Sequence, residues 1–314
     1  MGLVFHNGKF MPEEHIQKSI TEARVLRLLR SFLDANEPSL VRILVNTWNA
    51  QGKAITYKEL REAILNGDIS ADLLDEWMQD YTALVAEHLQ PAWEKAIAAA
   101  VSVIEQKCPL WHFDPMSAGV REWTAAHSAE FVTSVTTTQI EGLRAVVRRA
   151  AVLEDMSVDE LARTIRPMVG LYKGQAEANM RYFETLIANG TSQKRALDLS
   201  TRYAARQHRY RAMMIARQEL AMAYNTGADQ GVRQAQAAGY MGETVKVFCT
   251  ADDERTCPTC GGLEGAIVGM DEEFQIANRG RYRFTGLYPP VHIQCRCAVM
   301  YEEVGEPTIK RGTD

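Results

Sequence analysis

The chain has 314 residues, of which 46% are hydrophobic and 24% are charged, and its formal net charge is -5 at pH 7. Because this length exceeds what one hydrophobic core usually serves, two domains are expected. No apolar run approaches the roughly 20 residues that span a bilayer, which argues against a membrane protein. The mild overall acidity neither favours nor excludes nucleic acid as a partner.

The first two thirds of the chain are predicted to be helical almost throughout. Apolar spacing favours a helix over residues 16–33 and another from about Pro38, with a turn at residues 49–53. A longer helical pattern covers residues 71–106 and contains Pro91. Since proline disrupts a helix interior, we expect a kink or a division there.

Local signals mark where several of these helices begin and end. Thr56 precedes Glu59 by three residues, the spacing of a capping box, and Ser157 is a predicted N-cap. Residues 108–119 contain two prolines, a glycine and two aromatic side chains, which predicts a loop. Further helices are expected over residues 120–126, 138–153, 157–169, 173–189 and 192–223.

Beyond Gly239 the apolar period changes from that of a helix to that of a strand. Val245, Val247 and Cys249 alternate with other residues, and the same alternation appears over residues 297–301. These strands are expected to carry two segments rich in cysteine, around residues 257–260 and 292–297. The expected fold is mainly α with a small β-containing C-terminal lobe (α+β), in which an elongated helical N-terminal half precedes this cysteine-rich region.

Five potential soft-metal ligands lie in the C-terminal fifth of the chain: Cys257 and Cys260 in C-P-T-C, then His292, Cys295 and Cys297 in H-I-Q-C-R-C. A C-x-x-C pair on a tight turn brings two thiolates to one tetrahedral zinc ion, and a second His/Cys half completes the site. Cys295 and Cys297 are two residues apart, so in a strand they would point to the same side. Only one of them need be a ligand.

Three interpretations of this cysteine cluster stay open. A structural zinc knuckle is favoured, because zinc replaces a hydrophobic core in a short, polar, glycine-rich segment. A redox or catalytic thiol is the second, although no G-x-S-x-G, H-E-x-x-H or P-loop pattern accompanies it. Disulfides are the third, but the N-terminus lacks the basic start and apolar run of a secretory signal, which favours the cytoplasm.

An arginine-rich face is predicted on the helix that begins near Ser192. Arg195, Arg202, Arg206 and Arg209 fall within an arc of about 60° on a regular helix. Such a face could bind phosphates or an acidic protein surface, and of these two the protein is favoured. A solvated face without a partner is the competing interpretation.

The helix that follows this face and the cysteine cluster together resemble one known family. The run I-A-R-Q-E-L-A-M-A-Y-N-T-G-A at residues 215–228, then T-A-D-D-E-R-T-C-P-T-C-G-G-L-E-G and P-P-V-H-I-Q-C-R-C, is similar to the head-morphogenesis domain of tailed bacteriophages, the Mu F-like minor head protein family. The resemblance covers about residues 140–302. Gln218 departs from it, since Thr or Ser is expected there, and residues 1–135 resemble no family that we can name.

The resemblance implies a non-catalytic minor component of the phage head, made in the host cytoplasm and located in the virion near the portal vertex. It implies a role in procapsid assembly and genome packaging or delivery. The portal protein is the implied partner, with the major capsid or scaffolding protein and DNA as further candidates. The implied cofactor is structural zinc on the five cysteine and histidine residues, and the matching helix positions are Arg217, Glu219, Tyr224, Asn225 and Gly227.

Arg217 and Glu219 lie two residues apart and therefore on different sides of a helix. We expect them to pair with neighbouring elements and fix the helix against the zinc-bearing lobe, instead of forming a catalytic dyad.

Three regions are expected along the chain. Residues 1–135 form a helical, partner-binding region, residues 136–302 form a head-morphogenesis domain with the metal site, and residues 303–314 form a mobile tail.

Two alternatives come from other functional classes. A zinc-containing nuclease or toxin-like enzyme delivered with the virion is one, and the end of the sequence soon after Cys297 counts against an appended toxin domain. A host regulatory protein with a zinc-ribbon DNA-binding module is the other. Phosphate repulsion disfavours it, because the cysteine segment carries the acidic residues Asp252, Asp253, Glu254 and Glu264.

Overall fold

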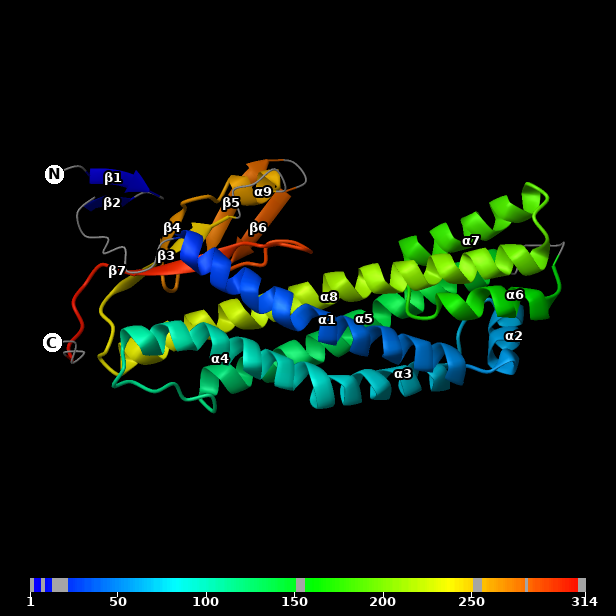
Figure 1. Ribbon diagram of the computed structural model, residues 1–314, viewed down its shortest axis with the longest axis horizontal. Coiled ribbons are helices and arrows are strands. Elements are labelled where there is room, and N and C mark those ends of the chain that lie inside the picture. Colours follow the sequence, from blue (N-terminus) through cyan, green and yellow to red (C-terminus); the bar gives the residue numbers. More distant parts are fainter. Residues whose placement is uncertain are drawn as a thin grey trace. The chain divides into compact units, whose positions relative to one another are not determined.

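The structure is a computed structural model that describes residues 3–6, 9–12, 22–150, 156–250, 256–279 and 282–309 (Figure 1). Its contacts group the chain into two compact units. Unit 1 comprises Met1–Glu37, Ala92–Glu122 and Met214–Asp314, and unit 2 comprises Pro38–Pro91 and Trp123–Met213. Each unit therefore draws on separate stretches of sequence, and neither coincides with the ranges 1–135 and 136–302.

Helices make up most of the described chain. They are α1 (Glu22–Ala54), α2 (Tyr57–Asn66), α3 (Ala71–Leu84), a π-helical turn (Val85–Leu89), α4 (Gln90–Lys107), α5 (Ala118–Ala150), α6 (Val158–Ile165), a 3-10 turn (Arg166–Met168), α7 (Lys173–Ala188), α8 (Gln193–Ala237) and the short α9 (Pro258–Gly261). Together with the small sheet of unit 1, they confirm the mainly α fold with a β-containing C-terminal lobe.

Helix α1 runs through Pro38 without a break, so the prediction of two helices and of a turn at residues 49–53 is wrong. An interior proline removes one backbone donor and crowds the carbonyl four residues earlier, at a cost of about 3 kcal/mol. Buried side chains continue into the expected turn: Trp48, just before it, is 1% exposed, and Gln51, within it, is 2% exposed. Packing of these side chains outweighs the local turn signals. Residues 16–21 of the expected first helix lie outside the described chain.

Helix α5 is likewise one helix where two, over residues 120–126 and 138–153, were expected. The threonine-rich stretch between them forms helices weakly. In the structure Thr133 and Thr138 each donate their hydroxyl to the carbonyl oxygen four residues earlier, at 2.9 Å, so these side chains bond within the helix. Residues 151–153 lie outside the described chain.

Helix ends that a side chain specifies are confirmed. Thr56 Oγ1 accepts from the Glu59 backbone N–H at 3.1 Å, and Glu59 accepts from the Thr56 N–H at 2.7 Å, which completes the capping box. Gly67 ends the same helix in the left-handed region, at φ 71°. The π-helical turn Val85–Leu89 separates α3 from α4 just before Pro91, as expected.

Unit 2 has an apolar core built mainly from α2, α3, α5, α6 and α7, with Trp77, Val146 and Met180 among its buried residues. Two polar side chains of α8 also enter it. His208 Nε2 lies 2.8 Å from the Val169 carbonyl oxygen, and Arg211 donates to the Gly170 carbonyl oxygen. Burial lowers the pKa of His208 to about 4, so the ring is neutral at pH 7.

The strands belong to unit 1. Strand β3 (Thr244–Cys249) lies between β4 (Ile267–Gly269) and β7 (Ala298–Glu303), and pairs antiparallel with both. Two separate antiparallel pairs are β5 (Phe274–Arg279) with β6 (Tyr282–Gly286), and β1 (Leu3–His6) with β2 (Lys9–Pro12). The strands expected near residues 245–249 and 297–301 thus correspond to β3 and β7.

The two faces of the β3–β7 pair have different neighbours. Phe248 and Val299 face the cysteine-containing core of the lobe, whereas Val247 and Met300 pack with Val25 of α1. Both faces of the β3–β7 pair are therefore buried. Even the charged residue of β3, Lys246, is 0% exposed. Its Nζ donates to the carbonyl oxygens of residues 272 and 287, at 2.7 and 3.1 Å.

The expected mobile tail is described as far as Ile309. The Val304 N–H donates to the Glu243 carbonyl oxygen at 2.7 Å, and the Ile309 N–H donates to the Gly239 carbonyl oxygen at 2.9 Å. This part of the tail therefore bonds to the connection between α8 and β3, while residues 310–314 lie outside the described chain.

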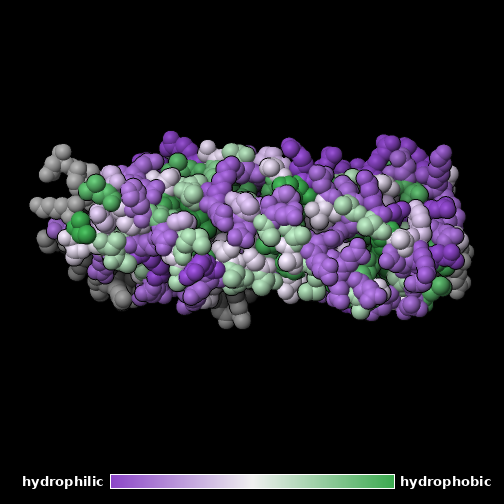
Figure 2. All heavy atoms as spheres, turned by 90° about the horizontal axis from the view of Figure 1, so that it is seen from below, coloured by the Kyte–Doolittle hydropathy of each residue, from purple (hydrophilic) through white to green (hydrophobic). Residues whose placement is uncertain are grey.

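The surface drawn in Figure 2 is mostly hydrophilic, with hydrophobic side chains in small separate areas. Among the described helices, none combines the length and the apolar character that crossing a bilayer requires.

Candidate metal centre

The C-x-x-C pair lies on a tight helical turn, as its spacing predicted. Cys257 is the N-cap of α9, Pro258 is its first residue, and the Cys260 N–H donates to Cys257 Sγ at 3.3 Å. His292, Cys295 and Cys297 lie in the loop that leads into β7. The expectation that strands carry the two half-sites is therefore wrong: a helical turn and a loop carry them, next to β3 and β7.

The structure brings all five predicted ligands together. His292 Nε2 lies 3.0 Å from Cys257 Sγ and 3.2 Å from Cys260 Sγ, and Cys260 Sγ lies 3.9 Å from Cys295 Sγ. Two groups of three donor atoms result, each with all its atoms within 4.8 Å of one another: Cys257, Cys260 and His292, and Cys260, Cys295 and Cys297. Cys260 is the member common to both groups.

This donor set fits a tetrahedral thiophilic metal ion. Zn–S bonds of about 2.3 Å place two thiolates about 3.8 Å apart in a tetrahedron, close to the 3.9 Å between Cys260 and Cys295. The sulfur–nitrogen distances to His292 are a few tenths of an ångström shorter than the roughly 3.5 Å of such a site. The histidine would therefore move slightly outward around an ion. The cluster could hold a metal.

A backbone contact orients the histidine for this task. His292 Nδ1 lies 2.8 Å from the Ile293 carbonyl oxygen, so Nδ1 carries the proton and Nε2 offers its lone pair to the sulfur cluster. Metal-binding histidines generally use such an outer hydrogen bond to fix the tautomer. His292 is exposed, whereas Cys260, Cys295 and Cys297 are at most 4% exposed. Solvent can therefore reach the site on the histidine side.

The cysteine pKa values diverge because the thiols are close together. Hydrogen bonds from Cys260 and Cys297 lower the pKa of Cys295, while hydrogen bonding to Cys295 raises the pKa of Cys260. For Cys257, burial raises the pKa, but the hydrogen bonds with the Cys260 backbone N–H and side chain and the charge of His292 together outweigh burial, so the net pKa is lowered. Thiolate character is thus present on both halves of the cluster, as metal binding requires.

Of the four acidic residues around the C-x-x-C pair, the structure describes only Glu264. Asp252, Asp253 and Glu254 lie outside the described chain. Glu264 accepts a hydrogen bond from the Thr250 backbone N–H at 2.7 Å, so its carboxylate holds the end of β3. A structural task therefore accounts for Glu264.

The family-motif residues Arg217 and Glu219 pair with neighbouring helices, as expected. The Arg217 guanidinium donates two hydrogen bonds of 2.7 Å to the Glu37 carboxylate on α1. Glu219 accepts from Trp93 Nε1 of α4 at 3.1 Å. These contacts attach α8 to α1 and α4. That the two residues also fix the helix against the zinc-bearing lobe stays a prediction.

Tyr224, Asn225 and Gly227 have packing positions on the same helix. Tyr224 contacts Phe32, with ring centroids 5.6 Å apart, and burial raises its pKa to about 12. Asn225 Nδ2 donates to the Ala221 carbonyl oxygen at 2.8 Å, within α8. A Cβ added to Gly227 would lie 2.5 Å from the Ile97 Cα of α4, so only glycine permits this helix–helix approach.

The contact that does join α8 to the lobe was missed at the sequence level. Arg233 donates to Asp229 at 2.7 Å, to Asp271 at 2.6 Å and to the Met270 carbonyl oxygen at 2.7 Å. The i,i+4 spacing of Asp229 and Arg233 was the available signal. Thr226 and Tyr288 add a second contact, with their hydroxyl oxygens 3.0 Å apart.

The predicted arginine-rich face is exposed on α8, within unit 2. Arg195 and Arg202 both bind Asp198, at 3.0 and 3.1 Å, which neutralises part of their charge. Arg206 lies over the Tyr203 ring, 5.5 Å from its centroid. Within the described chain neither Arg206 nor Arg209 forms a salt bridge, so these two carry the uncompensated charge.

Residues 145–300 match the sequence family described as Phage Mu protein F like protein. The match contains both the helix motif and the cysteine cluster, and agrees with the resemblance over about residues 140–302. No curated protein and no solved structure matches the chain.

Proposed function

We propose that this chain, whose residues 145–300 belong to the Phage Mu protein F like family, is a structural minor head protein of a tailed bacteriophage. It would be made in the host cytoplasm and reside in the virion head near the portal vertex. There it would act in procapsid assembly and in genome packaging or delivery. The family match over residues 145–300, about half of the chain, is the observation that carries this proposal.

Structural zinc is the proposed cofactor. Cys257, Cys260, His292 and Cys295 are the proposed ligands, because His292 Nε2 lies against the sulfur atoms of Cys257 and Cys260, and Cys260 Sγ lies 3.9 Å from Cys295 Sγ. Cys297, which lies within 4.8 Å of Cys260 and Cys295, is then the spare donor of the five and packs beside Val299 and Phe248. Four protein ligands complete a tetrahedral site, which supports a structural and non-catalytic role.

The arginine-rich face is the proposed surface for the portal. Arg206 and Arg209 provide charge that no acidic residue of the described chain neutralises, and tyrosine contact restricts the orientation of Arg206. Charged rims of this kind mainly raise association rates and make binding sensitive to salt. An acidic face of the portal would complement them. DNA, and the major capsid or scaffolding protein, are the further candidates for this surface.

Co-purification from infected cells tests the proposal directly. The chain is affinity-purified without chelator, and its zinc content and the portal protein are quantified. The double variant Arg206→Glu/Arg209→Glu is expected to retain at least tenfold less portal at low salt, with a smaller difference at high salt.

The control variant Lys53→Glu/Lys173→Glu makes the same charge change at two exposed lysines of unit 2 that lie outside the arginine-rich face, and it should retain the portal. Equal retention by wild type and both variants at every ionic strength would remove the arginine-rich face from the proposal. Absence of the portal from wild-type purifications, together with exclusion of the chain from purified virions, would overturn the function itself.

A further inference from the structure

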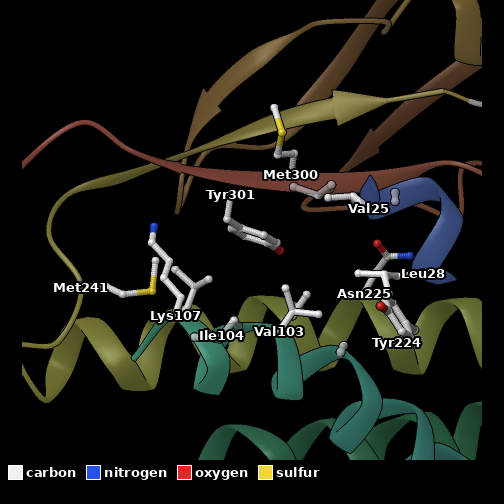
Figure 3. Close-up of a pocket in the computed structure, with 15 residues that line it drawn as sticks. Val25, Leu28, Val103, Ile104, Lys107, Tyr224, Asn225, Met241, Met300 and Tyr301 are labelled. Atoms are coloured by element: carbon white, nitrogen blue, oxygen red, sulfur yellow. The ribbon is translucent and has the colours of Figure 1, made fainter. Parts of the chain in front are cut away.

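A cavity of about 60 Å³ lies in unit 1 between β7 and the helices α4 and α8 (Figure 3). Most of its wall is aliphatic and includes Leu28, Val103 and Val299. Tyr301 projects from β7 into this space (Figure 3). Its hydroxyl oxygen is buried and has no hydrogen-bond partner among the described residues. Since a buried polar atom without a partner is costly, a guest that bonds this hydroxyl would stabilise the site.

A larger hollow of about 440 Å³ adjoins the cavity and shares Leu28, Val103 and Tyr224 with it. The walls of this hollow are more polar. Arg24 of α1 and Lys95 of α4 both line it and are both exposed. Within the described chain neither has a salt-bridge partner. The groove formed by the cavity and the hollow is therefore apolar at its inner end and cationic at its mouth.

Size and chemistry select among the occupants of this groove. A cavity of about 150 Å³ holds benzene, so the inner end, with about 60 Å³, is too small for an aromatic cofactor or an acyl chain. One aliphatic side chain is the guest of the right size. The Tyr301 hydroxyl requires a hydrogen-bond acceptor beside that side chain, and the two free cations require negative charge outside it.

An extended polypeptide has all three features within a few residues. We propose that the groove binds an acidic segment of a partner protein, which inserts one aliphatic side chain into the cavity. The Tyr301 hydroxyl donates to a backbone carbonyl oxygen of this segment, and its carboxylates lie against Arg24 and Lys95. Anchoring one side chain in a pocket within a polar rim is how proteins commonly recognise peptides. This surface shares no residue with the arginine-rich face and does not depend on the portal being the partner.

Methionine methyl NMR of the full chain tests the inference, because Met241 and Met300 line the cavity. The chain is labelled with [13C-methyl]methionine, and the two signals are assigned with the variants Met241→Leu and Met300→Leu. The probe is the blocked pentapeptide Asp-Glu-Leu-Glu-Asp. Saturable shifts of both signals are expected below a few millimolar peptide. Replacing the central leucine of the peptide by serine, or its acidic residues by lysine, should weaken binding at least tenfold.

Two variants of the chain make the test specific. Val103→Phe fills the cavity, and Arg24→Glu/Lys95→Glu reverses the charge at the mouth; each should weaken binding of the peptide at least tenfold. Ala98→Phe and Arg30→Glu/Lys194→Glu are matched controls at exposed positions and should bind like wild type. If Val103→Phe fails to fold by circular dichroism, the charge reversal decides the test, since exposed side chains rarely determine folding.

No saturable shift with the leucine peptide would overturn the proposal, as would shifts that persist in the charge-reversed variant. Sodium decanoate serves as a second probe. If decanoate moves the Met241 and Met300 signals and the peptide does not, the occupant is an amphiphile, and the assignment to a partner protein is wrong.

Discussion

Gly227 shows how a single missing side chain fixes the spacing of two helices. It lies on α8 against Ile97 of α4, where a Cβ would come within 2.5 Å of the Ile97 Cα and 2.7 Å of its carbonyl oxygen. Both are backbone atoms, so neither can move without displacing α4. Glycine costs a helix interior up to about 1 kcal/mol relative to alanine, and the close approach of the two helices offsets this cost.

Gly227→Ala is therefore expected to destabilise unit 1 by about 2–3 kcal/mol, because the overpacking outweighs the gain in helix propensity. Gly52→Ala in α1 is the control, since its added Cβ would meet its nearest neighbour at 3.4 Å, an ordinary contact. Urea unfolding followed by far-UV circular dichroism measures both variants. Equal stability of the two variants would contradict the tight contact.

His208 makes the stability of unit 2 depend on pH. Burial depresses its folded-state pKa to about 4 from the ordinary 6.5. As the pH falls below about 6.5, the unfolded chain takes up a proton that the folded chain does not, so stability is lost between about pH 6.5 and pH 4. Above pH 6.5 the contribution of the neutral ring is fully present.

Between pH 7 and pH 4.5 this residue alone should remove about 2.5 kcal/mol of stability, given a shift of about 2.5 units. His208→Gln keeps a donor for the Val169 carbonyl oxygen and does not titrate. Unfolding free energies of wild type and His208→Gln should therefore converge, or cross, as the pH falls. Parallel pH profiles for the two proteins would show that the imidazole does not stay neutral in the folded state.

At the scale of elements, α8 is attached to its neighbours by charged pairs as well as by packing. The Arg217–Glu37 pair joins it to α1, and the side chains are only 23% and 9% exposed. Burial limits screening by solvent, and the two parallel hydrogen bonds fix the geometry. Such a pair contributes more than a surface ion pair does, and removing one partner leaves the other buried without compensation.

A double-mutant cycle with Arg217→Gln and Glu37→Gln is expected to give a coupling energy of about 2 kcal/mol. The exposed i,i+4 pair Lys58–Glu62, with side chains 85% and 59% exposed and a 3.9 Å separation, is the matched comparison. Its cycle with Lys58→Gln and Glu62→Gln should give less than about 0.5 kcal/mol. Similar coupling in the two cycles would mean that burial of the Arg217–Glu37 pair adds nothing.

Sequence signals predicted helix ends better than helix continuity. Thr56 and Glu59 form a cap from atoms three residues apart, so the pattern alone contains the geometry. The helix breaks expected at residues 49–53 and 127–137 do not occur, because what keeps these helices continuous lies outside the local sequence. Their local propensities are weak, and the side chains that keep the helix continuous, such as the buried Trp48, act through residues distant in the sequence.

At the scale of the whole molecule, the cysteine cluster replaces part of a core. Cys260, Cys295 and Cys297 are buried beside Phe248, Phe274 and Val299 in a lobe of short strands. A metal on Cys257, Cys260, His292 and Cys295 would stabilise the folded lobe, because the unfolded segment does not hold its ligands in place. The helices lie largely upstream, so the effect should stay local.

Cys260→Ser is therefore expected to abolish stoichiometric zinc and to destabilise the lobe by more than about 4 kcal/mol, while far-UV helicity stays near wild type. Cys295→Ser should also lose the metal. Cys297→Ser is the contrasting variant and should retain it. Elemental mass spectrometry and limited proteolysis measure these outcomes, and retention of zinc by Cys260→Ser would remove that residue from the ligand set.

The sequence predicted the candidate ligands of the site well, their position in the fold less well, and the surrounding contacts not at all. The C-P-T-C and H-I-Q-C-R-C segments contain all five candidate ligands, and spacing alone identified them as candidates. Their position beside β3 and β7 was predictable only in outline, because it depends on strand pairing between residues about 50 apart. The partners of Arg217 and the space around Tyr301 had no sequence signal, since they arise where distant segments meet.

The separation of the two ligand segments also sets an order of events during synthesis. Cys257 and Cys260 leave the ribosome well before His292, Cys295 and Cys297, so the early pair exists for a time without its later ligands. Strand β7, the pairing partner of β3 along its whole length, directly follows the last cysteine. The three-stranded sheet of the lobe therefore cannot be completed before all five of these residues have been synthesised.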